Sequence, residues 1–187
     1  MLPLHTPRLC LRYFVNEDCE RLAAYRNDPE VARYQSWEHC TLAEATALIN
    51  NNKRRAFGLP GDWLQVAIVR KAGDLLIGDL AVKLQDRDPR QAIIGFTIAR
   101  DCQRQGYAAE AVGALFDHLF GVMALHRVIA ECDTRNAASW GLMEHLGMRR
   151  EAHNVQSTWF KGAWSDDYLY AILRHEWLAH KPMPSPV

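Results

Sequence analysis

Apolar and polar positions alternate with two different periods along this chain, and each change of period marks a new element. Runs rich in β-branched and aromatic residues predict strands at residues 9–14, 63–70, 75–84 and 92–99. Apolar residues at helical spacing predict helices at residues 16–27, 42–55 and 109–120. The second of these helices opens with Thr41 followed three residues later by Glu44, which is the sequence of a capping box.

The order of the elements predicts a layered fold. Strands gather early as an antiparallel meander with a hairpin turn at residues 71–74, whereas the second half alternates helix, strand, helix, strand, strand. This order favours a mixed sheet flanked by helices, in an α+β or α/β layered arrangement. Because no Pro-, Gly- or Ser-rich linker divides the sequence, residues 1–180 are predicted to form a single domain. The proline-rich residues 181–187 are predicted to be disordered.

Composition then narrows the class of protein. A chain of 187 residues with 49% hydrophobic content is long enough to bury one sizeable core. With 22 basic and 22 acidic residues the formal net charge is zero, so we expect no nucleic-acid partner and no anionic membrane surface. No apolar run approaches the length of a membrane span and no signal peptide is evident, which predicts a cytoplasmic protein.

Cysteines and histidines form no recognisable ligand or disulfide pattern. The five cysteines are odd in number and widely separated, and the eight histidines lack metal-ligand spacing. Cys10 and Cys132 lie in strand-like runs, where we expect them to pack as small apolar residues rather than to act as nucleophiles. We therefore expect free thiols and no metal.

The sequence Gln-Arg-Gln-Gly-Tyr-Ala at residues 103–108 carries the clearest chemical signal. It lies between a predicted strand and a predicted helix, where the first helical amides have no partner and the helix dipole adds partial positive charge. Such a turn can bind a phosphate group through its main chain, and Gly106 and Ala108 keep side chains out of the way. By residue types alone, an ordinary strand-to-helix connection is an equally good interpretation.

The same pattern, Gln103-x-x-Gly106-x-Ala108, resembles the pyrophosphate loop of the GNAT superfamily of N-acetyltransferases. The opening Thr6-Pro7-Arg8-Leu9 is similar to the Thr-x-Arg-Leu signature of its RimJ/RimL-like branch. The Asn-x-x-Ser segment at residues 136–139, the Leu-Gly turn at 146–147 and the ending at 164–173 resemble that branch in the same order. The resemblance covers nearly the whole chain and implies the GNAT fold, with a mixed central sheet of about seven strands.

The resemblance implies acetyl-CoA as co-substrate, held by main-chain groups of the loop and of the preceding strand. Arg104 either adds a charge-assisted contact to the cofactor or is a solvated loop cation. The implied cofactor-binding residues are Ile98, Ala99, Gln103, Arg104, Gln105, Gly106, Tyr107, Ala108, Asn136 and Ser139.

Glu131 is the candidate general base, because it is a carboxylate within an otherwise apolar strand. Burial makes a carboxylate a better base near neutrality. Its spacing from Asn136 resembles that of the catalytic glutamate in related ribosomal-protein acetyltransferases. The alternatives are that Glu131 pairs with Arg127 or Arg135 on the sheet face, or that Asp133 or a water chain is the base.

The proton donor departs from the commonest pattern of the superfamily. Many members use a tyrosine six residues after the asparagine, a position that is Leu142 here. The serine of Asn-x-x-Ser is the usual substitute in the RimJ/RimL-like branch, which implies that Ser139 bonds the CoA sulfur and that Asn136 contacts the pantetheine or the substrate amide. The alternative is that both residues only cap a helix.

The acceptor pocket is implied between the first helices and the last hairpin. The residues available there are Tyr34, Trp37, Glu38, Trp159, Trp164 and Tyr168. Aromatic rings with a carboxylate suit a cationic amine, although the same rings are equally suited to core or dimer contacts. The acceptor is either a protein N-terminal amine or a small amine, and homodimers are common in this branch.

Together these features predict an N-acetyltransferase that acts by direct attack of an amine on the thioester in a ternary complex. Leu142 keeps open the alternative of a non-catalytic acyl-CoA-binding or regulatory module. A dinucleotide-binding oxidoreductase is not supported, because no Gly-x-Gly-x-x-Gly follows the first strand.

Overall fold

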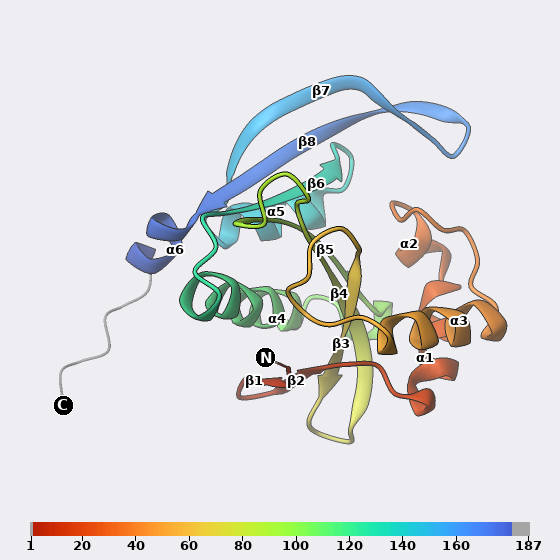
Figure 1. The fold of residues 1–187 in the computed structure, drawn as a ribbon. Coiled ribbons are helices and arrows are strands. Elements are labelled where there is room, and N and C mark those ends of the chain that lie inside the picture. Colours follow the sequence, from red (N-terminus) through yellow and green to blue (C-terminus); the bar gives the residue numbers. More distant parts are fainter. Residues whose placement is uncertain (1, 181–187) are drawn as a thin grey trace, which may run out of the picture.

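A mixed sheet runs through the protein and supports all the other elements (Figure 1). The computed structural model describes residues 2–180, and the strand order in its sheet is β1-β2-β3-β4-β5-β6-β8-β7. The eight strands are β1 (Leu4–His5), β2 (Leu9–Arg12), β3 (Leu64–Arg70), β4 (Leu75–Leu84), β5 (Gln91–Ile98), β6 (Arg127–Asp133), β7 (Arg149–Phe160) and β8 (Ala163–Leu173). Neighbouring strands are antiparallel except β5 and β6, which are parallel.

Helices flank this sheet on both faces. Within the described residues they are α1 (Cys19–Arg26), α2 (Pro29–Ala32), α3 (Leu42–Lys53), α4 (Tyr107–Phe116), α5 (Ala137–His145) and α6 (Arg174–His180). Short 3-10 turns precede α1 and follow β5, at Asn16–Asp18 and Arg100–Cys102, and a π-helical segment, Asp117–Val122, extends α4.

The predicted fold class is confirmed, with differences at the element ends. The sheet has eight strands where about seven were expected, because the two-residue strand β1 adds itself to the edge by pairing with β2. The capping box at α3 is confirmed: the Thr41 hydroxyl accepts from the Glu44 amide at 3.2 Å, and the Glu44 carboxylate accepts from the Thr41 amide at 2.8 Å. Residues 181–187, predicted to be disordered, lie outside the described residues.

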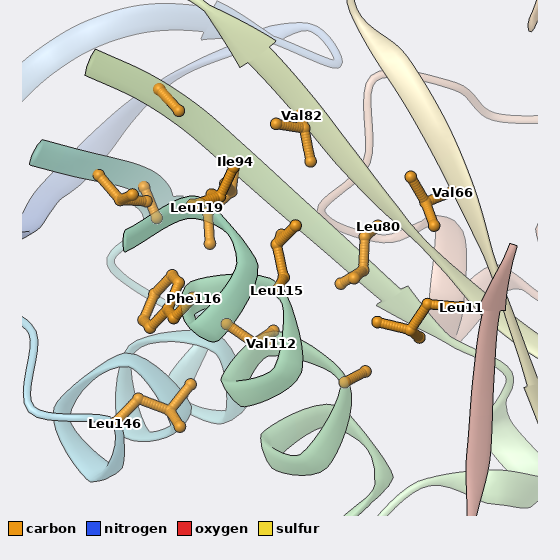
Figure 2. Close-up of a cluster of buried hydrophobic side chains, with 14 of the residues drawn as sticks. Leu11, Val66, Leu80, Val82, Ile94, Val112, Leu115, Phe116, Leu119 and Leu146 are labelled. Atoms are coloured by element: carbon orange, nitrogen blue, oxygen red, sulfur yellow. The ribbon is translucent and has the colours of Figure 1, made fainter. Parts of the chain in front are cut away.

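One face of the sheet is covered by α4 and its π-helical extension. Figure 2 shows Leu115 and Leu119 pointing from this helix toward Leu80 and Ile94 on the central strands. All four side chains are buried, and each fully buried leucine or isoleucine contributes about 1.5–3 kcal/mol relative to exposure. This cluster fixes α4, and with it the turn at residues 103–106, against β5.

The opposite face is covered only in part. A second cluster packs α1 and α3 against β3 and β4, with Leu22 and Ile49 among its buried members. Further along the sheet, the side chains of that face are half-buried at Ile93 and Ile129 and exposed at Glu131. A strip of β5 and β6 therefore remains accessible on the side away from α4, and we call it the uncovered face.

Gly78 is required where β4 approaches β5. The register of β3 against β4 shifts between Ile68 and Val69, which produces a bulge beside Gly78. A Cβ atom at Gly78 would lie 2.1 Å from the backbone oxygen of Thr97. No side chain can be accepted there unless the last residues of β5 move.

We therefore expect Gly78→Ala to lower the free energy of unfolding by about 1–3 kcal/mol, since it overpacks a site bounded by backbone. The measurement is equilibrium unfolding in guanidinium chloride. Gly95→Ala is the matched control, because a Cβ at that strand position would lie at an ordinary 3.7 Å from the Ala81 Cβ. Equal stability of the two variants would contradict the predicted clash.

Candidate active site

The parallel strands β5 and β6 separate before they end. Their pairing runs from Gln91 with Arg127 to Ile94 with Ala130, and beyond that β6 pairs only with β8. β5 nevertheless continues to Ile98. Main-chain groups at the carboxyl ends of the two strands are thus not paired with each other, and we call the region between these ends the V-shaped opening. Ligands bind at this end of the strands in parallel sheets.

Two backbone groups at the end of β5 are already engaged. The Ala99 amide donates to the Ile77 oxygen at 2.8 Å, and the Ile98 oxygen accepts from the Gln103 side chain at 2.9 Å. Alternation along a strand directs the Ile98 amide to the side opposite β4, toward the opening. Of the two amides at residues 98 and 99, the Ile98 N–H is therefore the one directed toward the opening, whereas the Ala99 N–H is engaged with β4.

The turn before α4 presents main chain rather than side chains. Residues 103–106 are exposed, and both Arg104 (φ 58°) and Gly106 (φ 78°) are left-handed. Gly106 is the N-cap of α4, and no side chain among the described residues caps the first amides of the helix. The side chain of Gln105 is directed back to the Asp101 oxygen at 3.1 Å. The arrangement leaves outward-facing amides at a helix N-terminus, which can hold an anion.

Arginine side chains attach this turn to the rest of the fold. Arg21 on α1 bonds both carboxylate oxygens of Asp101 at 2.8 Å and the Leu76 oxygen at 3.2 Å. Arg8, from the turn before β2, donates to the Gln105 oxygen at 2.9 Å. In the sequence, Arg8 was notable only as part of the Thr-x-Arg-Leu segment at the start of the chain. Its contact with the loop was not predicted.

The expected burial of Glu131 is wrong. Its side chain is exposed, and among residues 2–180 it makes no hydrogen bond or ion pair. The pairing alternative is also wrong, because Arg127 pairs with Glu151 and Arg135 with Asp133. Strand alternation explains the error: the neighbouring side chains of β6 face α4, whereas Glu131 points from the uncovered face.

Asp133 is buried and bound to Arg135. Its carboxylate accepts from the Arg135 guanidinium at 2.5 and 2.9 Å and from the Arg135 amide at 2.8 Å. The side-chain hydrogen bond to Arg135 holds the pKa of Asp133 below its ordinary value, against the opposing effect of burial. A carboxylate stabilised in this way is a weaker base than a free one.

Asn136 and Ser139 lie together at the start of α5. The Asn136 side chain accepts from the Ser139 amide at 3.3 Å, so Asn136 caps the helix as the alternative interpretation proposed. The Ser139 side chain also reaches the Cys132 thiol, which ends the apolar face of β6. Asn136 and Ser139 are therefore on the opposite side of β6 from Glu131.

Four of the six residues predicted for the acceptor pocket can be placed by their contacts, and Tyr168 lies apart from the other three. The Tyr34 hydroxyl donates to the Arg135 oxygen at 3.3 Å, which brings the end of α2 beside the turn after β6. The Arg26 guanidinium lies 4.1 Å from the centre of the Trp37 ring. Tyr168 faces the α4 side of the sheet and packs against its core cluster, away from Glu131.

Trp164 belongs to a long hairpin that extends beyond the sheet (Figure 1). Its ring meets that of Trp159 at 5.5 Å, and the two side chains remain 57% and 61% exposed. At the hairpin turn, the Lys161 ammonium donates to the Ala32 oxygen at 2.7 Å and the Trp37 oxygen at 3.0 Å. The hairpin is thus attached to the α2 region, a contact that the sequence did not reveal.

Within residues 2–180, no cluster of three or more His, Cys, Asp or Glu side chains is arranged to hold a metal ion. No helix in the same part of the chain is long and apolar enough to cross a bilayer.

Comparison with known proteins identifies the family. A family model described as an acetyltransferase (GNAT) domain matches residues 8–149. This chain belongs to the GNAT family of N-acetyltransferases. The uncharacterized N-acetyltransferase YnaD of Bacillus subtilis is 33% identical over 173 residues, which cover 92% of this chain and 97% of YnaD. A GNAT-family acetyltransferase from Bacillus anthracis has a TM-score of 0.83 at 28% identity and covers 94% of this chain and 100% of its own.

More distant relatives extend the comparison. The [ribosomal protein uS5]-alanine N-acetyltransferase of Escherichia coli is 26% identical over 84 residues, 45% of this chain and 43% of its own. This relationship confirms the predicted likeness to ribosomal-protein acetyltransferases. Spermidine N-acetyltransferase from Vibrio cholerae, solved with CoA and spermine, has a TM-score of 0.79 at 21% identity, covering 92% and 99% of the two chains. At that identity the likeness is one of GNAT fold.

Cys132 is expected to resist alkylation in the folded protein. Burial raises the pKa of its thiol to about 11, although the hydrogen bond with Ser139 opposes this effect. At about pH 8 the nucleophilic thiolate is therefore scarce. Iodoacetamide labelling followed by peptide mass spectrometry should show little modification of Cys132 until concentrated urea unfolds the chain. Equal labelling rates with and without urea would contradict this expectation, and the half-buried Cys19 serves as an internal reference.

Proposed function

We propose that this GNAT protein transfers the acetyl group of acetyl-CoA to a primary amine by direct attack in a ternary complex. The observation that carries the proposal is the V-shaped opening between β5 and β6 beside the exposed amides at the start of α4. The opening suits the arm that carries the thioester, and the exposed amides suit the pyrophosphate. The two lie next to each other because β5 leads directly into α4. The Vibrio cholerae neighbour with CoA bound supports the same ligand by analogy.

In this proposal the pyrophosphate is held by main-chain amides of residues 105–108, and Arg104 supplies a cation. Arg104 is exposed and has no ion-pair partner among the described residues, so its charge is available. Gln105 contributes through its main-chain amide, since its side chain is engaged within the turn. Gln103 lies alongside, with its side chain bonded to the Ile98 oxygen and its amide to the Arg100 oxygen at 3.3 Å. The pantetheine would follow the opening past residues 98 and 99 toward Asn136.

The bound thioester supplies the activated acetyl group, and the protein's task is to polarise it and to manage two protons. The Ile98 N–H is our candidate for the donor to the thioester oxygen. A fixed donor of this kind stabilises the charge that develops on the oxygen, an effect worth about 3–4 kcal/mol where single donors have been removed from other enzymes.

Glu131 is our candidate for the group that accepts the proton of the attacking amine. It lies on the uncovered face of β6, from which an acceptor can reach the opening, and no arginine neutralises it. Asp133 is less suited, because it is bound to Arg135. Glu131 acts either directly or through water.

Ser139 is our candidate for the group that protonates the departing CoA sulfur. It lies beside the thiol of Cys132, on the face of β6 opposite Glu131. The amine would thus approach from one face of β6 while the sulfur leaves toward the other. Asn136 would orient the pantetheine through its side-chain nitrogen, because its oxygen caps α5.

For the acceptor we propose a primary amine of a protein N-terminus or of a small molecule. The names of two relatives, a ribosomal-protein-alanine enzyme and a spermidine enzyme, represent these two classes. Tyr34 is the predicted aromatic residue nearest the turn that follows β6, whereas Trp37 and Trp164 would contribute from the α2 region and the hairpin. A cytoplasmic location remains our expectation.

We expect Gly106→Val to abolish binding of acetyl-CoA. Valine disfavours the left-handed conformation at φ 78°, and its Cβ would lie 3.3 Å from the Arg8 guanidinium. Isothermal titration should give binding for the wild-type protein and none for the variant. Gly121→Val is the control, since a Cβ there meets no atom within 4 Å. Failure of the wild-type protein to bind acetyl-CoA would rule out the proposed function.

We expect Glu131→Gln to lower kcat by about 10²–10⁴-fold with little change in acetyl-CoA affinity, because it removes a general base. The measurement is thiol release with a panel of small amines and N-terminal peptides. Glu20→Gln, at an exposed position on α1, should retain full activity. Binding of acetyl-CoA without turnover of any acceptor would instead favour a non-catalytic acyl-CoA-binding module, for which Leu142 is the sequence argument.

A further inference from the structure

The turn before β2 lies against the start of α4, although the two segments are far apart in the sequence. The Arg8 guanidinium makes three contacts there: Nη1 donates to the Gln105 oxygen at 2.9 Å, Nε donates to Glu110 at 2.6 Å, and its carbon lies 4.5 Å from the centre of the Tyr107 ring. The bonded pairs are 97 and 102 residues apart along the chain. One side chain therefore touches the turn, the first residue of α4 and its first-turn carboxylate.

Glu110 accepts most of the hydrogen bonds in this contact. Its carboxylate accepts from the Thr6 hydroxyl at 2.6 Å and from the Arg8 amide at 2.9 Å, in addition to the Arg8 side chain. Burial opposes ionisation, but these hydrogen bonds outweigh it and hold the pKa of Glu110 below its ordinary value. The side chain of Glu110 is only 15% exposed, so its ion pair with Arg8 is partly shielded from solvent. Thr6 and Arg8 are the two polar residues of the Thr-x-Arg-Leu opening.

The bond to the Gln105 oxygen fixes the direction of the next amide. In a planar trans peptide, the C=O of one residue and the N–H of the following residue point in opposite directions. Because Arg8 holds the Gln105 oxygen toward the β1–β2 turn, the Gly106 N–H points away from it. Arg104 and Gly106, on either side of Gln105, are both left-handed, a conformation that glycine adopts readily.

Arg8 also removes an electrostatic conflict. Glu110 places a carboxylate in the first turn of α4, next to the amides that would hold the pyrophosphate. An unpaired negative charge there would repel the ligand. The guanidinium of Arg8 compensates this charge at 2.6 Å and remains 47% exposed, so that a positive charge stays at the edge of the turn.

We propose that Arg8 is a positioning residue for the cofactor, which holds the Gln105–Gly106 peptide with its N–H toward the pyrophosphate and neutralises Glu110 beside it. This inference rests on the proposed function, because it assumes that the turn binds the pyrophosphate of CoA. Arg8 acts through the main chain of the turn and is not itself a catalytic residue.

The test compares wild type, Arg8→Ala, Arg8→Lys and Arg90→Ala by isothermal titration with CoA. Loss of hydrogen bonds to a charged group should raise the Kd of Arg8→Ala about tenfold or more. Arg8→Lys should fall between this variant and wild type, since an ammonium keeps the charge but cannot serve two acceptors with a rigid fork. Arg90 pairs with Asp88 before the opposite end of β5, so its replacement should leave the Kd unchanged.

Amide NMR of the free proteins distinguishes positioning from a general loss of structure. We expect Arg8→Ala to shift or broaden the Gly106 amide signal while the amides of β3 and β4 keep their wild-type positions. A CoA Kd for Arg8→Ala within twofold of wild type would overturn the inference, as would an unchanged Gly106 signal. If Arg8→Ala does not fold, the same two criteria apply to Arg8→Lys. Absence of CoA binding by wild type would instead refute the proposed function itself.

Discussion

The early separation of β5 and β6 is the constraint on which the rest of the site depends. A continuous parallel ladder would use the main-chain groups of both strands for each other. Here the last pair is Ile94 with Ala130, and both strands continue beyond it while held from their other sides by β4 and β8. The core side chains of α4 keep the helix packed beneath β5 (Figure 2), so the turn at residues 103–106 is presented at the mouth of the opening. Strand pairing thus creates the opening, and the packing of α4 places the turn beside it.

The two faces of β6 have different environments, and this difference organises the proposed chemistry. On one face, Cys132 closes the core and the Ser139 side chain lies against it at the start of α5. On the other face, α1 and α3 pack against β3 and β4 but not against β6, so the Glu131 side chain is exposed. In our proposal the amine is deprotonated on the second face and the sulfur is protonated toward the first, which keeps base and acid apart. The Glu131 side chain is exposed in the free protein, and in our proposal a bound acceptor would exclude water from it.

The structure shows what the two polar residues of the Thr-x-Arg-Leu segment contact, which the sequence motif alone does not reveal. Thr6 and Arg8 meet Glu110 and the Gln105 oxygen, while Arg21 on α1 holds Asp101 on the other side of the turn. These side chains come from distant segments and restrain the turn. In our proposal the amides are therefore positioned before the cofactor binds, and less conformational entropy is lost on binding.

The sequence by itself determined the features that depend on neighbouring residues. The capping box of Thr41 and Glu44, the meander, and the strand-turn-helix connection around Gly106 are local patterns, and the order of several motifs along the chain was enough to indicate the GNAT family. Only the tertiary structure decided which face of β6 carries Glu131, that Tyr168 packs against the core cluster on the other face, and that Arg8 reaches residues about a hundred positions away. The physical reason is that periodicity and capping act over a few residues, whereas burial and ion pairing depend on which helices cover which strands, and that is settled only when distant segments pack together.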